Sequence, residues 1–400
     1  MQRRTFLSAA GLSILGRRAL LGAPGRSDSS LSTPLCDALG IRLPIVQSGM
    51  GRVAGPELAA AVSNSGGLGI LAGLGVPADD LRAEIRRMRE LTDRPFGVNL
   101  WLHEQLQPPI DPATLPREQI SAVQATLNTF RERLGLAPRT DPPAPLPDTI
   151  DEAFEVILEE RVPVWSIGLG DPGAERVERC HRLGIRVMAM VATLADARQV
   201  EASGVDLIVA QGGEAGGHRS TWVKSANRER ANIGTLALMP QIVDAVSVPV
   251  IAAGGIVDGR GLVAALALGA SGILMGTRFV ATRESQAPPL WKEAIRSGDS
   301  DDTTVTDVYT GLWMRALRNR FSDEYEASGT PVLPGLLQAN AAGDIYAAAA
   351  ARSDPSHFPL AAGQSAGLIA DLPGAADVVA AVAEEALDVL DALRIGRGAE

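Results

Sequence analysis

The chain has 400 residues, of which 46% are hydrophobic, and its formal net charge is −10 at pH 7. This length exceeds one average domain but accommodates a barrel with appendages, and the acidic balance argues against nucleic acid as a partner because phosphate binding needs a cationic face. The only cysteines, Cys36 and Cys180, provide neither a disulfide framework nor a zinc cluster, so no metal site is expected.

The N-terminus carries the arginine pair Arg3 and Arg4, and a short apolar stretch over residues 7–15 follows it. This order is typical of a twin-arginine export signal, which carries folded proteins. A second arginine pair interrupts the apolar run, so a disordered basic leader on a cytoplasmic protein is the alternative. We expect residues 1–30 to be a leader that uses the twin-arginine export machinery, and the protein to be periplasmic. No stable membrane insertion is expected, because no segment reaches the ~20 apolar residues of a membrane span.

Apolar runs bounded by glycine, proline and charged helical stretches repeat eight times along the chain. Most of these runs are continuous, not alternating, which is typical of parallel strands covered on both faces. With intervening helices, they predict an α/β fold, a (β/α)8 TIM barrel, over residues 31–285. An open doubly wound sheet is the alternative. The predicted strands are Pro44–Met50, Gly67–Ala72, Phe96–Trp101, Val162–Gly168, Arg186–Ala192, Asp206–Gln211, Val248–Gly254 and Gly272–Phe279.

Two regions fall outside this repeat. Residues 102–151 form an insertion with a charged helix, Arg117–Leu134, and a proline-rich stretch; it is either a decorated loop or a lid over the barrel mouth. Residues 286–400 follow the barrel as a segment that is predicted to be helical and to end in a long helix, Gly374–Arg394. We expect this segment to pack across the barrel or against a second subunit, which would make the protein a homodimer.

The sixth predicted strand ends in a glycine-rich turn, QGGEAGGH, over Gln211–His218. The chain has four histidines, and this one follows closely spaced small residues, which let the backbone approach a ligand. Because an imidazole supplies an acid or base near neutral pH, His218 is the candidate catalytic residue. The alternative is a turn histidine that bonds to the backbone. Glu214 is a second candidate acid or a brace of the turn, and His103 could face the barrel mouth.

Glycines also end the seventh and eighth predicted strands, where this fold commonly holds a phosphate. Ala253, Gly254 and Gly255 end the seventh, and Gly276 and Thr277 end the eighth. Their backbone N–H groups suit an anion, and the positive end of the following helix adds to this. Tight turns that the barrel geometry itself demands are the alternative reading.

The remaining strand ends carry neutral polar and soft apolar side chains with few charges. Such a lining suits a polarizable heteroaromatic ring with hydrogen-bonding edges, and a ring together with a phosphate suggests FMN. No G-x-G-x-x-G fingerprint opens a βαβ unit, so a dedicated NAD site is not indicated. The residues concerned are Gln47, Ser48, Gly49 and Met50 after the first strand, Asn99 and Trp101 at the third, Met190 at the fifth and Gln211 at the sixth.

Several segments of the chain together are specific for one protein family, although no single segment is. They are QSGMG (Gln47–Gly51), SGGLGIL (Ser65–Leu71), DRPFGVNL (Asp93–Leu100), QGGEAGGH (Gln211–His218), AAGGIVDGRG (Ala252–Gly261), ALGASGILMGTRF (Ala267–Phe279), ATRES (Ala281–Ser285), LRNRF (Leu317–Phe321) and AAGQSAGLI (Ala361–Ile369). Together they resemble the nitronate monooxygenases, which are FMN-dependent barrel enzymes. The resemblance runs from about Leu35 to about Leu390, with the proline-rich insertion outside it.

This resemblance implies oxidation of an alkyl nitronate by O₂ to a carbonyl compound and nitrite, with His218 as the base. Some members carry lysine where this chain has Met190 and aspartate where it has Gln211, and Arg219 is a candidate to replace the missing cation. The resemblance implies flavin contacts at Ser48, Gly49, Met50, Asn99, Trp101, Gln211 and Gly216, with Met190 and Gly217 beside them, and phosphate contacts at Ala253, Gly254, Gly255, Gly276 and Thr277.

Three other functions compete with this interpretation. A flavin- and NAD(P)H-dependent enoyl-acyl-carrier-protein reductase shares the barrel and a similar Gly-Gly-His turn, but the predicted export signal weighs against cytoplasmic fatty-acid synthesis. An enzyme of the IMP dehydrogenase type is disfavoured because no cysteine follows the sixth strand. A non-enzymatic flavin-binding protein is the third alternative.

Overall fold

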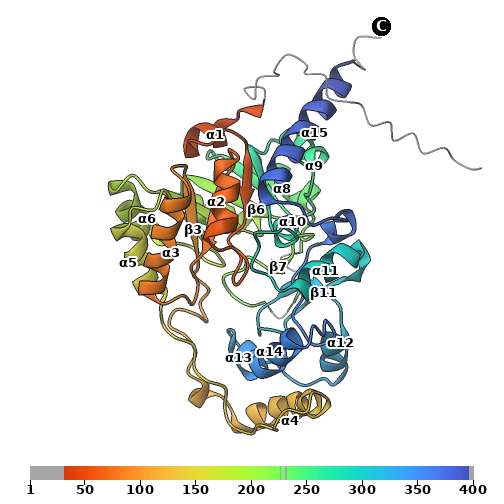
Figure 1. Ribbon diagram of the computed structural model, residues 1–400. Helices are drawn as coiled ribbons and strands as arrows, with labels where there is room; N and C mark the ends of the chain where they lie inside the picture. Colours follow the sequence, from red (N-terminus) through yellow and green to blue (C-terminus); the bar gives the residue numbers. More distant parts are fainter. Residues whose placement is uncertain (1–30, 226, 230–231, 396–400) are drawn as a thin grey trace, which may run out of the picture.

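Eight parallel strands form a barrel with helices on its outside, as the sequence predicts (Figure 1). The computed structural model describes residues 31–225, 227–229 and 232–395, so the predicted leader lies outside the described residues. The first and last strands in the sheet order meet through a parallel bridge between Val46 and Leu68, which closes the ring. In sheet order the strands are β1 (Ile45–Gln47), β9 (Gly272–Met275), β8 (Val250–Ala253), β6 (Leu207–Gln211), β5 (Arg186–Val191), β4 (Val164–Gly168), β3 (Phe96–Trp101) and β2 (Gly69–Ala72).

The predicted eighth strand, Gly272–Phe279, is wrong in its second half. The strand ends at Met275, and Thr277–Val280 forms the short helix α10. The backbone N–H groups of Phe279 and Val280 both donate to the carbonyl of Gly276, so the chain becomes helical as soon as it leaves the barrel edge. The first strand likewise ends at Gln47 and leaves residues 48–50 as a loop at the mouth.

The barrel has an apolar interior and an apolar outer layer. Interior side chains such as Val46, Ile70 and Ile251 form one cluster, and the short helix α1 (Pro34–Leu39) joins it by Leu35 and Leu39. The long helix α15 (Ala375–Ile395) packs against α9 and α2. The surrounding helices are α2 (Pro56–Asn64), α3 (Ala78–Leu91), α5 (Ile150–Glu159), α6 (Gly173–Arg182), α7 (Leu194–Ala202), α8 (Thr235–Val243) and α9 (Gly259–Ala267). No helix in the described part of the chain has the length and apolar character that a membrane crossing requires.

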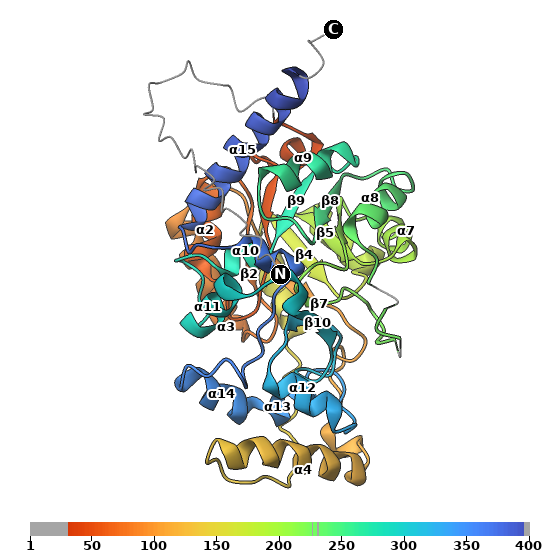
Figure 2. The same cartoon turned by 90° about the vertical axis from the view of Figure 1, so that its right-hand side faces the viewer.

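Helix α4 (Arg117–Arg133) of the insertion lies beside the helices α12 (Arg320–Ala327), α13 (Leu337–Ala341) and α14 (Gly343–Ala351) of the C-terminal segment, away from the barrel strands (Figures 1 and 2), and these helices share a second hydrophobic core. Helix α4 contributes Val123, Leu127 and Phe130 to it. Its Arg131 is fully buried and forms an ion pair with Asp344 at 2.9 Å. The insertion therefore covers the C-terminal helices, not the barrel mouth directly. The other elements of these regions are η2 (Pro112–Thr114), α11 (Pro289–Ser297), η3 (Ser300–Asp302) and η4 (Gln364–Leu368).

The C-terminal segment is mainly helical, but it also contains two strands that the sequence analysis did not anticipate. Strands β10 (Thr303–Thr306) and β11 (Met314–Leu317) pair with each other, and β11 pairs with β7 (Gly217–His218) in the glycine-rich turn. All three are antiparallel neighbours, with Met314 opposite His218. Residues almost 100 positions later in the chain thus fix the backbone of the candidate catalytic histidine.

Candidate active site

The imidazole of His218 lies between the end of β3 and the C-terminal segment. The ring of Trp101 approaches it edge-on, with a centroid distance of 4.7 Å and an interplanar angle of 62°. Its Nε2 lies 2.9 Å from Oγ1 of Thr310. Thr310 precedes β11 and carries no local sequence signal, so sequence reasoning did not find it. Thr310 and His218 are 92 positions apart in the chain, and the pairing of β7 with β11 brings them together.

The hydroxyl of Thr310 determines which nitrogen of His218 is basic. A hydroxyl has one proton to donate, and we assign that of Thr310 to the carbonyl of Leu312, which lies 3.2 Å from Oγ1. The oxygen is then left to accept a hydrogen bond from Nε2–H of His218. The neutral ring therefore keeps its free lone pair on Nδ1, and Nδ1 is the atom that can accept a proton.

Burial of the His218 ring, together with the neighbouring His103 and Arg219, lowers its pKa to about 3. The residue as a whole is half-buried, so it keeps some surface at the barrel mouth. At neutral pH the imidazole is consequently uncharged, which is the form that a general base needs.

Gln211 and Ser220 brace the histidine turn. The amide Nε2 of Gln211 donates to the carbonyl of His218 at 2.9 Å, and its Oε1 accepts from the N–H of Ser220 at 2.8 Å. The hydroxyl of Ser220 donates to the carbonyl of Met190 at 2.7 Å and accepts from the N–H of Leu169 at 3.1 Å. Ser220, which the sequence analysis missed, ties the turn to the ends of β4 and β5.

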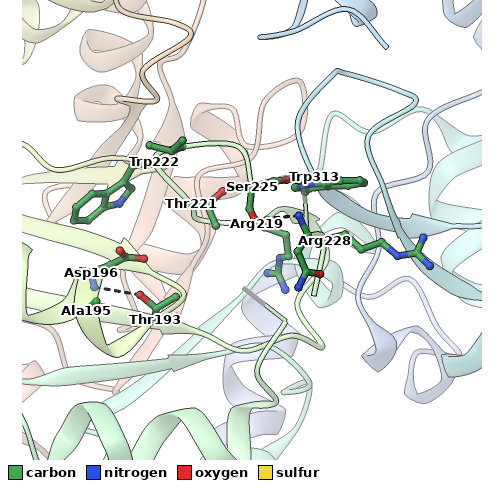
Figure 3. A pocket seen from close by; sticks show the side chains of 11 residues that line it. Thr193, Ala195, Asp196, Arg219, Thr221, Trp222, Ser225, Arg228 and Trp313 are labelled. Carbon is green, nitrogen blue, oxygen red and sulfur yellow. Dashed lines mark hydrogen bonds between the residues drawn. The ribbon is translucent and has the colours of Figure 1, made fainter. Parts of the chain in front are cut away.

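The side chain of Arg219 does not lie in the same place as that of its neighbour His218. Its guanidinium donates to the carbonyl of Gly212 at 2.9 Å, and burial lowers its pKa to about 9. Consecutive residues of an extended chain point to opposite faces, and Arg219 lines a cavity of 330 Å³ together with Trp222 and Trp313 (Figure 3). The expectation that Arg219 replaces a cation beside the flavin therefore finds no support in its contacts.

Glu214 is a brace, not an acid poised at the mouth. Both of its carboxylate oxygens accept from the N–H of Thr235 at 2.9 Å, and one also accepts from the Thr235 hydroxyl at 2.8 Å. Thr235 is the first residue of α8, so the carboxylate caps this helix. The carbonyl of Gly254 lies 3.0 Å from the same hydroxyl oxygen, so the cap packs directly against the end of β8.

The loops predicted to hold a phosphate come together at the ends of β8 and β9. Gly254 and Gly255 both have positive φ, at +107° and +72°, a region that other residues avoid. A Cβ on Gly254 would lie 3.0 Å from the backbone nitrogen of Ala215, so this turn also packs closely on the histidine turn. The N–H of Gly363 donates to Oγ1 of Thr277 at 3.0 Å and adds the C-terminal AAGQ segment to the same edge.

The predicted site residues all lie on the carboxyl-terminal edge of the barrel, but they differ in exposure. The side-chain amide of Asn99 donates to Ser166 and, like that of Gln211, is already engaged. A Cβ on Gly217 would meet nothing within 4 Å, so Gly217 faces open space, whereas one on Gly276 would be in van der Waals contact with Met50 at 3.5 Å. Half-buried are Ser48, Gly49, Met50, Trp101, Met190, Gly216, Gly217, Gly254 and Gly276; Asn99, Gln211, Ala253 and Thr277 are buried, and Gly255 is exposed.

A closed β/α barrel with a neutral histidine and glycine-lined strand ends at its carboxyl-terminal mouth defines a barrel enzyme whose site lies at that mouth. The family model described as "Nitronate monooxygenase" matches residues 32–385. The chain belongs to this family.

Three relatives illustrate the similarity. The nitronate monooxygenase of Pseudomonas aeruginosa is 40% identical over 354 residues, which cover 87% of this chain and 97% of the relative. The structure of a nitroalkane oxidase from Streptomyces ansochromogenes superposes with a TM-score of 0.81 at 35% identity, covering 90% of this chain and 100% of that one. FabK from Thermotoga maritima superposes with a TM-score of 0.69 at 32% identity, covering 90% and 98%.

Proposed function

We propose that this enzyme oxidises alkyl nitronates with O₂ to a carbonyl compound and nitrite, with FMN as its cofactor. Membership of the nitronate monooxygenase family supports the reaction. The observation that carries the proposal is the placement of His218, whose imidazole lies at the barrel mouth against the ring of Trp101, with its Nε2 held 2.9 Å from Oγ1 of Thr310.

The residues at the mouth fit a flavin mononucleotide. The consecutive positive-φ glycines Gly254 and Gly255 would hold the phosphate together with Gly276 and Thr277, because only backbone amides without bulky side chains approach an anion this closely. The half-buried residues 48–50 and Trp101 would contact the ring. When bound, FMN supplies the acceptor for the electrons of the nitronate, and O₂ is the final oxidant.

The protein itself moves one proton. Nδ1 of His218 would take the proton from the carbon of a neutral nitroalkane, while Nε2–H stays bonded to Thr310. A nitronate has already lost this proton, so it needs binding and orientation more than it needs the base. General bases of this kind contribute ~10²–10⁴-fold to the rate.

One assay tests the proposal. Purified, flavin-loaded protein is mixed with propionate 3-nitronate and O₂, and nitrite is measured without any nicotinamide cofactor. Nitrite release is the expected result. Protein that binds flavin but releases no nitrite would overturn the proposal.

A second candidate function is an NAD(P)H-dependent enoyl-acyl-carrier-protein reductase, because the Gly-Gly-His turn after β6 suits that reaction as well. The enoyl reductase domain of MlnA from Bacillus amyloliquefaciens also shares the fold, at 12% identity and a TM-score of 0.60, which concerns the fold alone. Oxidation of NADH with an enoyl thioester, measured beside the nitrite assay, separates the two. We expect nitrite release and no thioester-dependent NADH oxidation.

Export through the twin-arginine machinery and assembly into a homodimer complete the proposal. The arginine pair Arg3–Arg4 supports export. Fractionation of the native host distinguishes a periplasmic from a cytoplasmic enzyme, and light scattering of the purified protein distinguishes a dimer from a monomer.

A further inference from the structure

A second histidine, His103, is held rigidly in the loop that follows β3. Its Nδ1 accepts a hydrogen bond from the N–H of Gln105 at 3.1 Å, and the residue is 1% exposed. The loop is anchored on both sides of the histidine: the N–H of Leu102 donates to Gly168 at 3.1 Å, and that of Glu104 donates to Trp222 at 3.3 Å. The ring therefore has a defined orientation.

This orientation leaves one buried donor without a partner. Because Nδ1 uses its lone pair to accept from Gln105, the neutral ring carries its proton on Nε2. Nε2 of His103 is buried and has no hydrogen-bond partner among the described residues. Buried donors are almost always hydrogen-bonded, because an unmade bond destabilises the folded protein. The side-chain Oε1 of Gln105 is also unpartnered, but the two atoms do not bond to each other.

His103 and the base His218 belong to the same region of the barrel mouth. Trp101, whose ring touches His218, is the last residue of β3 and lies two residues before His103 in the chain. A charge on His103 lowers the pKa of His218, and burial together with Lys224 lowers the pKa of His103 to about 4. Lys224 in turn is paired with Asp307 at 2.6 Å, in the same segment as Thr310. At neutral pH both imidazoles are uncharged.

We propose that His103 is a substrate-binding residue whose Nε2–H donates a hydrogen bond to an oxygen of the nitro or nitronate group. This inference rests on the proposed function. The two histidines then have separate tasks: His218 offers a lone pair to the carbon-bound proton, and His103 offers an N–H to the oxygens. The negative charge of a nitronate lies largely on those oxygens, and hydrogen bonds to charged groups are the stronger ones. A neutral His103 whose Nδ1 is already engaged does not compete with His218 for the proton.

The test compares His103→Phe, which keeps a flat ring but removes the donor, with His103→Gln, which keeps an N–H. Two quantities are measured: the KM and kcat for a preformed nitronate, and the Kd of nitrite, a non-reacting anion, from the change in flavin absorbance. We expect His103→Phe to raise both KM and the nitrite Kd about 10-fold or more with a smaller change in kcat, since a bond to a charged acceptor contributes about 1.5–3 kcal/mol. His103→Gln should recover most of the affinity.

His181→Gln is the matched control, because this histidine is 41% exposed and pairs with Asp206 before the start of β6, away from the mouth. Flavin content and melting temperature show whether each variant is folded. Unchanged KM and nitrite Kd in folded His103→Phe would overturn the inference, as would loss of flavin in both His103 variants, which would make the residue structural. A wild-type enzyme that releases no nitrite would instead overturn the proposed function, and the nitrite-binding measurement would still decide the role of His103.

Discussion

Replacing Thr310 by valine should impair the enzyme selectively. Valine keeps the size and branching of threonine, but it removes the oxygen that accepts from Nε2 of His218 at 2.9 Å. The ring then loses the contact that fixes its tautomer, and part of the enzyme carries its proton on Nδ1, where the base is needed. The defect should therefore appear with nitroalkanes, whose carbon must be deprotonated, and hardly at all with preformed nitronates.

The size of the effect follows from the single contact that is lost. A neutral hydrogen bond contributes about 0.5–1.5 kcal/mol net, and about 1.36 kcal/mol corresponds to tenfold in rate. The kcat/KM for a nitroalkane should fall about 2- to 13-fold, while that for the matching nitronate changes less than about two-fold.

The assay is initial-rate nitrite release at pH 7 from nitroethane and from its nitronate, at equal flavin occupancy. Thr310→Ser is the control, because it retains the hydroxyl and should behave like the wild type. Equal losses on both substrates would refute the division of labour, and an equally impaired Thr310→Ser would show that packing, not the hydroxyl, matters at this position.

Three further outcomes are expected. His218→Ala should lower activity on nitroalkanes by ~10²–10⁴-fold and on nitronates much less, with flavin retained; equal losses would contradict the role of this residue as a base. Gly254→Ala should weaken flavin binding at least about 10-fold in a reconstitution titration, because alanine is strained at φ +107° and its Cβ would lie 3.0 Å from Ala215; Gly135→Ala, at φ +60° with nothing within 4 Å, should not. The free energy of unfolding should fall with pH below 6.5, because the pKa of His103 is lowered from 6.5 to about 4 by folding, so the unfolded chain binds the proton first. The free energy of unfolding should be about 2 kcal/mol lower at pH 5. In His103→Phe, the loss of unfolding free energy between pH 7 and 5, measured by chemical denaturation, should be smaller by that amount. An unchanged pH dependence would argue against a buried neutral ring.

The features that the sequence predicted correctly are those that depend on consecutive residues. Continuous apolar runs such as Val164–Gly168 specified buried parallel strands, and the turn after Gln211 specified a histidine at their carboxyl-terminal edge. The first three residues of helix α10 were assigned to the eighth strand because they follow the apolar run Gly272–Met275 almost directly, and only the hydrogen bonds to the carbonyl of Gly276 show that the chain turns helical there.

The brace of the active site was missed for a different reason. Ser220 and Thr310 are small hydroxyl residues that occur anywhere on a protein surface, and their roles depend on Met190 and His218, which the barrel and the β7–β11 pairing bring to them. Strand β11 itself escaped notice because its four residues lie in a segment that was predicted to be helical.

The sequence by itself determined the barrel and the presence of an imidazole among glycines at its mouth, because apolar periodicity and turn chemistry act between neighbours in the chain. Only the tertiary structure indicates which nitrogen of that imidazole is basic, and only it shows that Nε2 of a second histidine, His103, is buried without a hydrogen-bond partner among the described residues. A tautomer is set by the partner of the opposite ring nitrogen, and for His218 that partner lies 92 residues away.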